Sequence, residues 1–294
     1  MSPLAAEVNH TLAASTDESF SWWYWHWHPD LYSGLLLFTG LYLLYVGPLR
    51  GRLVWPDVVR PSRGQVVSFL AGVVVMLFAL AGPVHELAES YLFSAHMAQH
   101  VLIILVVPPL LLLGTPGWLL RPILRFDTIM RLGKLFTHPV VAFALFNAVF
   151  AGWHFPVFYE GALRAQGFHI LQHLLFMATA VIMWWPILSP LPELPRLNYP
   201  AQMLYLIFMS IAQTPLFAAI TFSSSPIYSF YEAAPRVWGI SPLADQQIGG
   251  IIMKLSWLVV FLPAICIVFL RWFYREEGEG SQEFGPPVRD GHVG

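Results

Sequence analysis

Long apolar runs separated by short polar segments make up most of this chain. Each run approaches the ~20 residues that an α-helix needs to cross the hydrocarbon core of a bilayer. We expect transmembrane helices at about residues 31–49, 65–84, 92–114, 137–154, 168–187, 201–222 and 248–272. The pattern therefore predicts an all-α fold: a polytopic membrane protein whose seven-transmembrane-helix bundle forms one domain over residues 31–275.

Several of the predicted helices contain prolines in their interior. The clearest cases are Pro108, Pro109, Pro215 and Pro263. Packed transmembrane bundles tolerate such prolines because neighbouring groups satisfy the backbone atoms that a kink frees. We therefore expect kinked helices at these positions, not breaks in the spans.

The segments that flank the bundle differ from it in composition. Residues 1–30 are expected to form an extracytoplasmic N-terminal segment, and its Trp-rich end at residues 22–28 is typical of an interfacial aromatic belt. Residues 276–294 are rich in Gly, Glu and Pro, which favours a disordered cytoplasmic tail.

The overall composition supports a membrane location. Hydrophobic residues account for 57% of the chain and charged residues for 11%, whereas about 25% charged is usual in soluble domains. The lipid bilayer is therefore an expected partner. The net charge of −2 and the scattered basic residues argue against nucleic acid as a partner.

Lys and Arg are distributed unequally between alternate loops. The N-terminal segment and the second loop contain none, the fourth loop contains only Arg164, and the sixth only Arg236. The other loops and the tail contain Arg50, Arg52, Arg60, Arg63, Arg121, Arg125, Arg131, Lys134, Arg196, Arg271, Arg275 and Arg289. Because short cytoplasmic loops are enriched in Lys and Arg, we expect the N-terminus outside the cytoplasm and the C-terminus inside. This orientation requires an odd number of spans, which agrees with seven.

Most of the histidines fall in or next to the predicted outer leaflet. They are His26, His28, His85, His96, His100, His154, His169 and His173. Two of the predicted helices begin with the same pattern, HxxQH, at residues 96–100 and 169–173. Residues four apart lie on one face of a helix, so each pair should point two ring nitrogens in one direction.

The sequence around these two pairs also repeats. Each pair follows a helix that ends in a histidine, His85 in one case and His154 in the other, which suggests duplicated hairpins. The glutamine inside each pattern, Gln99 or Gln172, lies on nearly the same stripe. It is placed to hydrogen-bond the far nitrogen of a ligating ring.

Imidazoles gathered at one depth predict a metal or haem site. A single histidine at a membrane interface is usually a packing residue, and a proton relay or pH sensor remains an alternative for the group. Cys266 is the only cysteine, so His, Met or carboxylate side chains must supply the ligands. Met97 and Met177 lie near the histidines, either as thioether ligands or as flexible core residues.

Two charged residues of the last predicted helix are further candidates for a functional role. Asp245 lies at its outer end, either as an N-cap or as a group that neutralises a metal site or orients an imidazole. Lys254 lies inside the span, where Asp245 or Glu232 would be its partner unless its side chain extends to the surface. The paired glycines Gly249 and Gly250 should allow close approach of a neighbouring helix.

Several motifs in order resemble one known family. They are Ser94–His100, Pro108–Leu110, Gly114–Pro116, Trp153–Pro156, His169–His173, Trp184–Pro186 and Asp245–Gly250. Together they are similar to the CtaG family of multi-span bacterial cytochrome c oxidase assembly factors, from about residue 30 to 275. The chain departs from that family at Lys254, where a Trp is expected after Met253.

The resemblance implies a multi-pass protein of the bacterial plasma membrane that matures a haem–copper oxidase through copper delivery or retention. It carries over His96, His100, His154, His169, His173 and Asp245 as motif positions, and the histidine pattern adds His85 to the predicted metal ligands. The expected partners are an oxidase subunit and a soluble copper donor. A homodimer is compatible with this interpretation.

Three function classes compete. The leading hypothesis is a copper-binding and transfer protein that is not an enzyme. A membrane cytochrome that binds haem through facing histidines and takes electrons from a quinol is the alternative. A transporter ranks last because the predicted midplane of the bilayer is almost devoid of ionisable groups.

Overall fold

The structure is a computed structural model that describes residues 20–23, 25, 27–49 and 59–283. Within these residues all regular elements are helical, as the hydrophobic pattern predicted. The longer helices are α2 (Pro29–Val46), α4 (Arg63–Ala81), α10 (Pro139–Trp153), α12 (Gln166–Leu188), α13 (Tyr199–Ala212) and α16 (Pro242–Glu283). The shorter ones are α5 (Pro83–Ser90), α6 (Phe93–Val101), η1 (Leu102–Val106), α7 (Val107–Gly114), α8 (Gly117–Leu124), α9 (Asp127–Phe136), α11 (Pro156–Arg164), α14 (Thr214–Thr221) and α15 (Ser229–Ala233).

Part of the expected termini lies outside the described residues. His26 and most of the predicted N-terminal segment belong to that part. At the other end helix α16 continues to Glu283, and the rest of the predicted tail, from residue 284, is not described.

Six of the described helices or helix pairs are long and apolar enough to cross a membrane, one fewer than the sequence predicted. The missing one is the span expected at 137–154, where α10 has only 15 residues. Helix α9 precedes it at an angle of 73°, and the number becomes seven if this bent pair counts as one span. The bend falls just before Pro139, and a residue that precedes proline is disfavoured in helical conformation.

The two adjacent prolines of the third span show how a bundle satisfies a freed backbone group. The segment η1 is a π-helical turn between α6 and α7, directly before Pro108 and Pro109. Neither proline has an N–H, so the carbonyl of Ile104 has no donor one turn further along its own helix. The indole Nε1 of Trp184, on α12, donates to this carbonyl over 3.1 Å. The expected kink is therefore an irregular turn that a neighbouring helix stabilises.

Two glycines let α16 approach its neighbours closely, as expected. A Cβ atom on Gly249 would lie 2.4 Å from Cδ1 of Phe93, and one on Gly250 would lie 2.2 Å from Oγ1 of Thr221. Because α6 begins at Phe93 and α14 ends at Thr221, any larger side chain at either glycine would separate α16 from one of these helices.

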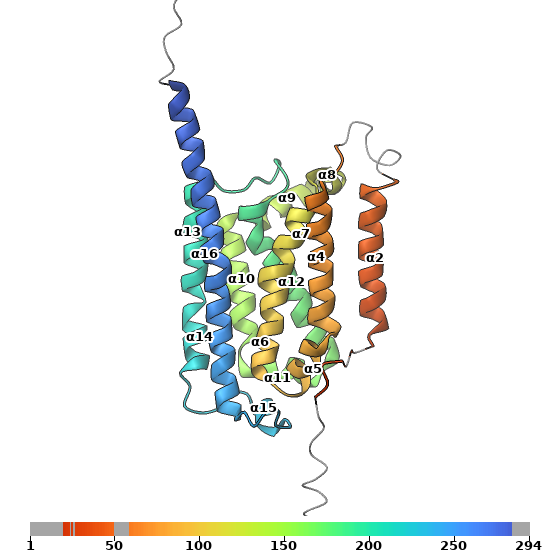
Figure 1. Cartoon of the computed structure of the whole chain (residues 1–294), viewed down its shortest axis with the longest axis vertical. Helices are drawn as coiled ribbons and strands as arrows, with labels where there is room; N and C mark the ends of the chain where they lie inside the picture. The colour runs from red at the N-terminus through yellow and green to blue at the C-terminus, as the bar shows by residue number, and fades with distance from the viewer. Residues whose placement is uncertain (1–19, 24, 26, 50–58, 284–294) are drawn as a thin grey trace, which may run out of the picture.

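Helix α2 stands beside the bundle, mainly next to α4 (Figure 1). Only 11% of this span is buried. Its firmest contact is Tyr42, whose ring stacks on Phe69 at 3.6 Å between centroids and whose hydroxyl donates to the carbonyl of Gly114 over 2.8 Å. Tyr42 lies near the C-terminal end of α2, and near the other end the ring of His28 lies 5.5 Å from that of His85.

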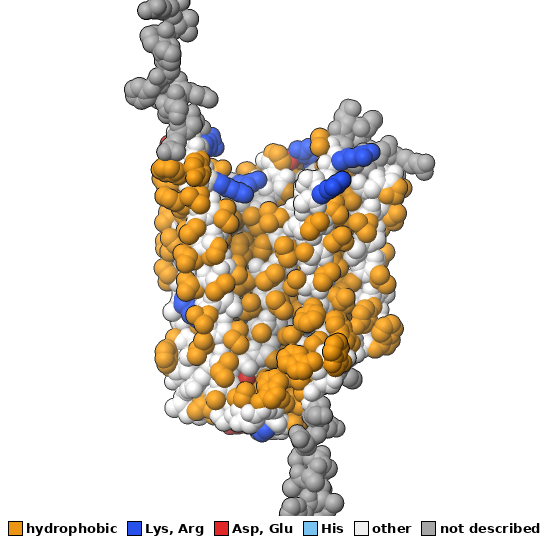
Figure 2. All heavy atoms as spheres, in the orientation of Figure 1, with side chains coloured by type: hydrophobic (Ala, Val, Ile, Leu, Met, Phe, Trp, Pro, Cys, Tyr) orange, Lys and Arg blue, Asp and Glu red, His pale blue; other side chains and the backbone are white. Residues whose placement is uncertain are grey.

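The two ends of the bundle differ in charge. Helices α8 and α9 lie at one end, and α5, α11 and α15 lie at the other (Figure 1). Figure 2 shows that most of the visible Lys and Arg side chains gather at the end of α8 and α9. The histidine pairs belong to the first two turns of α6 and α12, and α5, α11 and α15 lie at the end opposite α8 and α9 (Figure 1).

Candidate metal centre

The two histidine pairs predicted from the sequence face each other across the interface of α6 and α12. The ring centroids of His96 and His169 are 5.3 Å apart, and those of His100 and His173 are 5.6 Å apart. Within each pair the rings are 4.3 Å apart, which follows from the i, i+4 spacing on a helix. His154, which follows α10, joins this group at 6.2 Å from His100. We call these five residues the histidine cluster.

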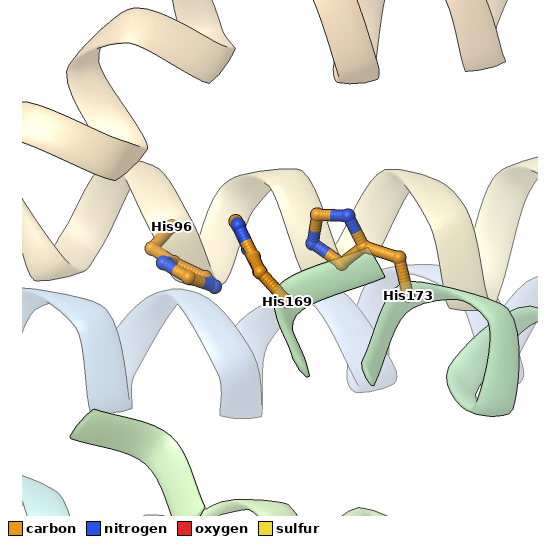
Figure 3. A group of neighbouring side chains, drawn as sticks. All are labelled: His96, His169 and His173. Atoms are coloured by element: carbon orange, nitrogen blue, oxygen red, sulfur yellow. The ribbon is translucent and has the colours of Figure 1, made fainter. Parts of the chain in front are cut away.

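Three members of the histidine cluster come close enough to hold one metal ion. One ring nitrogen from each of His96, His169 and His173 lies within 4.8 Å of the other two. Figure 3 shows the three side chains, with His169 and His173 on the same helix and His96 on another. Nitrogens bound at about 2 Å to a central ion lie roughly 3.5 Å apart, so a small inward movement of these side chains would suffice.

Neighbouring acceptors determine which nitrogen of each ring carries the hydrogen. Nδ1 of His154 lies 2.7 Å from the carbonyl of Phe150, and Nδ1 of His169 lies 2.9 Å from Oε1 of Glu89. Since a carbonyl can only accept and an ionised carboxylate likewise accepts, both Nδ1 atoms donate. In the neutral form of each ring, Nε2 is therefore the nitrogen whose lone pair a metal requires.

His96 is oriented in the same way by a tyrosine. Its Nδ1 lies 3.0 Å from the hydroxyl of Tyr231, and that hydroxyl donates its only proton to the carbonyl of Ala88 over 2.7 Å. Tyr231 must then accept from His96. Burial raises the pKa of the Tyr231 hydroxyl, which keeps it protonated. The lone pair of His96 Nε2 points to His100, whose Nε2 lies 2.8 Å away.

Several buried nitrogens of the cluster have no hydrogen-bond partner in the protein. They are Nδ1 of His100 and the Nε2 atoms of His154, His169 and His173. Buried polar atoms are nearly always paired, and each unpaired one costs about 1–3 kcal/mol. Neutral imidazole nitrogens in this state suit copper, zinc or iron. The donor set thus fits the metal site that the sequence predicted.

His85 occupies a different position from the other predicted ligands. Its Nδ1 lies 3.0 Å from Nε2 of Gln99, which also donates to the carbonyl of Ala79 over 2.9 Å. Its Nε2 lies 3.3 Å from Oε1 of Glu89. Nδ1 is thus engaged by an amide, and Nε2 lies beside the carboxylate that contacts His169. Gln99 therefore hydrogen-bonds an imidazole as expected, but the imidazole is that of His85 on α5 and not one of its own helix, α6.

Gln172 differs from its counterpart in the repeated pattern. Both amide atoms of Gln172 are buried without a hydrogen-bond partner, so the expected bond to an imidazole is absent from the structure. The two HxxQH motifs therefore share the spacing of their histidines but not the role of their glutamine.

Asp245 anchors the helix that carries the first histidine pair. Its Oδ2 accepts from the backbone N–H of Phe93 over 2.7 Å, and its Oδ1 accepts from Ser94 over 3.1 Å. The carboxylate therefore caps α6 and not its own helix, α16. At the start of α16 the side chain of Ser241 accepts from the backbone N–H of Ala244 instead. In this structure Asp245 stabilises the position of α6, and its role as a metal ligand stays a prediction.

The remaining candidates make contacts of their own, and Met97 lines a small cavity together with His100 and His154. Met97 is fully buried, and its Cγ is among the atoms that a Cβ on Gly249 would meet, so it packs toward α16. Met177 packs on the core and lines a cavity beside His173. The ammonium of Lys254 donates to Oγ1 of Thr214 over 2.9 Å, so its partner is neither of the carboxylates expected.

Two contributors to the centre were not found from the sequence. Glu89 could have been found, because it follows His85 by four residues in a short polar segment. Tyr231 lies in the sixth loop, 135 positions from His96, and no spacing rule connects the two. Long-range side-chain contacts of this kind become visible only once the helices are packed.

The comparisons with known proteins agree with the resemblance of the motifs. A family described as cytochrome c oxidase caa3 assembly factor (Caa3_CtaG) matches residues 40–275. Uncharacterised proteins of Mycobacterium bovis and Mycobacterium leprae are each 27% identical to this chain, over 75% and 80% of its length. The chain spans only 36% and 37% of those relatives. No solved structure matches. The chain belongs to the cytochrome c oxidase caa3 assembly factor family.

Proposed function

We propose that this protein binds copper through its histidine cluster and passes the ion to a subunit of a haem–copper oxidase in the bacterial plasma membrane. One observation carries the proposal: the cluster buries imidazole nitrogens whose lone pairs have no protein partner. The description of the family as a cytochrome c oxidase assembly factor supports an oxidase as the recipient.

The donor set suits a metal that must leave again. His96, His169 and His173 offer one nitrogen each, and no carboxylate oxygen is part of this group. Imidazole binds copper well, and copper(I) accepts such low coordination numbers. A site with few protein ligands leaves room for an incoming ligand of the oxidase. Binding and release of this kind require no catalytic step.

We place the cluster at the extracytoplasmic end of a seven-span bundle whose N-terminus is outside. Two observations support this orientation. Most of the visible Lys and Arg side chains gather at the opposite end (Figure 2), and cytoplasmic loops are normally the basic ones. The bent pair of α9 and α10 would complete the odd number of spans. A soluble copper donor would then load the protein from the outer face.

Haem binding is the second candidate, and one observation favours it. A cavity of about 620 Å³ has His85, His169 and His173 on its wall, together with many apolar side chains. Haem would give the purified protein a Soret band and stoichiometric iron. Colourless protein from cells with ample haem would exclude this alternative.

The handover is tested in cells whose only copy of this chain is the His96→Ala, His173→Ala variant. The oxidase isolated from these cells should contain its haem but lack most of its copper. The control is His138→Ala, since His138 is exposed beside α10 and makes no side-chain cap. An oxidase with full copper content in the cluster variant contradicts the proposed handover.

A further inference from the structure

A large cavity lies between α2 and the rest of the bundle, beside the histidine cluster. Its volume is about 620 Å³, within the range of ligand-binding cavities. Leu31, Gly34 and Leu35 of α2 form one side, and residues of α4, α5, α11 and α12 form the others. Toward its other end α2 is attached through Tyr42, whose hydroxyl donates to the carbonyl of Gly114.

The polar residues of the cavity lead toward the metal centre. Three predicted ligands, His85, His169 and His173, lie on its wall, whereas His96, His100 and His154 do not. Glu89, whose side chain is 32% exposed, also lines it and contacts His169. Asp30 and His28 lie on the wall at the end of α2, and the ring of His28 is 5.5 Å from that of His85.

The charge of this wall favours a cation. Asp30 and Glu89 contribute two carboxylates, and Arg164 is the only Lys or Arg among the lining residues. The guanidinium of Arg164 pairs with Glu160 over 3.0 Å, which offsets its positive charge. A metal ion that enters the cavity therefore meets carboxylate and imidazole groups before it reaches the buried nitrogens.

The direct path from the outer face is closed by aromatic side chains. Tyr159, Tyr228 and Tyr231 are each no more than 2% exposed, and Tyr228 donates to the carbonyl of His154 over 2.9 Å. Helix α15, which carries Tyr231, is held by Glu160, whose Oε1 accepts from the backbone N–H and the hydroxyl of Ser229. This tyrosine layer covers His96 and His154.

From the open cavity and the closed tyrosine layer, we infer that a metal ion reaches and leaves the cluster sideways, through the cavity beside α2. His169 and His173 are the members of the histidine cluster that lie on this route, and Glu89 is the carboxylate that contacts His169 there. The inference rests on the proposed metal binding and adds the path.

A single-cysteine variant tests the route in folded protein. Cys266 is the only cysteine of the chain, so Cys266→Ser provides a cysteine-free background. Gly34→Cys places a thiol on the cavity wall, and Gly40→Cys places one on the same helix away from the lining residues. A Cβ atom at either position meets no other atom within 4 Å, so both variants should fold.

Each purified variant is loaded with copper(I) from a coloured chelator before and after reaction with a bulky maleimide. Labelling at position 34 should slow loading by about tenfold or more, a modest rise in the barrier, and leave the final copper content unchanged. Labelling at position 40 should change neither. Equal loading rates before and after labelling at position 34 would contradict the proposed route. A thiol at position 34 that does not react with the maleimide would contradict it as well. Unlabelled protein that takes up no copper at all contradicts the proposed function as well.

Discussion

At the scale of single residues, the environment of His96 shows how a metal site is prepared. The hydroxyl of Tyr231 donates to the carbonyl of Ala88, which leaves only its lone pairs for Nδ1–H of His96. The ring is thereby held with Nε2 toward the cluster. Groups of this kind that orient a ligand typically contribute 10–100-fold to metal affinity.

Replacing Tyr231 with Phe should therefore weaken copper binding by roughly 10–100-fold, because His96 loses the group that holds its tautomer. A competition titration with a copper(I) chelator measures this change. Tyr228→Phe is the matched control, since that hydroxyl donates to a backbone carbonyl and contacts no ring nitrogen of the cluster. Equal losses of affinity in the two variants would mean that Tyr231 acts only through packing.

The sequence predicted the histidines of the cluster better than their surroundings. The i, i+4 spacing of His96 with His100 and of His169 with His173 follows from helix geometry alone, so the facing pairs could be expected. The contact of Glu89 with His169 joins α5 to α12 and depends on helix packing, which no local pattern encodes. The sequence also grouped His85 with the metal ligands; in the structure its Nδ1 lies 3.0 Å from Nε2 of Gln99 and its Nε2 lies 3.3 Å from Oε1 of Glu89, and its role as a ligand stays a prediction.

At the scale of helices, Asp245 of α16 connects the last span to the start of α6. Its two oxygens satisfy the N–H groups of Phe93 and Ser94, which have no partner inside α6. Asp245→Ala should lower the free energy of unfolding by about 1–2 kcal/mol, the usual cost of a lost cap. Thermal unfolding in mild detergent measures this loss.

The same variant distinguishes a cap from a metal ligand. If Asp245 only positions α6, the folded Asp245→Ala protein should bind as much copper as the wild type. An Asp245→Ala protein that is folded but binds no copper would identify Asp245 as a ligand.

Helix positions were predicted better than helix breaks. The runs expected at 168–187 and 201–222 correspond to α12 and to α13 with α14. The run at 137–154 yields a helix that is too short to cross a membrane by itself, because Pro139 separates α9 from α10. Hydrophobicity reports which residues prefer lipid, whereas the angle between two helices depends on the packing around the break.

At the scale of the whole molecule, the proposed copper transfer requires that the cluster and the basic loops lie on opposite sides of the membrane. Ser224, between α14 and α15, and Arg196, between α12 and α13, are both exposed. In a Cys266→Ser background, a membrane-impermeant maleimide applied to intact cells should label Ser224→Cys but not Arg196→Cys. Labelling of Arg196→Cys alone would reverse the proposed orientation.

The central claim is that the histidine cluster holds copper, and the copper content of the purified protein tests it most directly. Elemental analysis of copper, zinc and iron is made on wild type, the His96→Ala, His173→Ala variant and the His138→Ala control, all from copper-supplied cells. We expect stoichiometric copper in the wild type and the control and its loss from the double variant. Iron in place of copper, or copper retained by the double variant, would contradict the account.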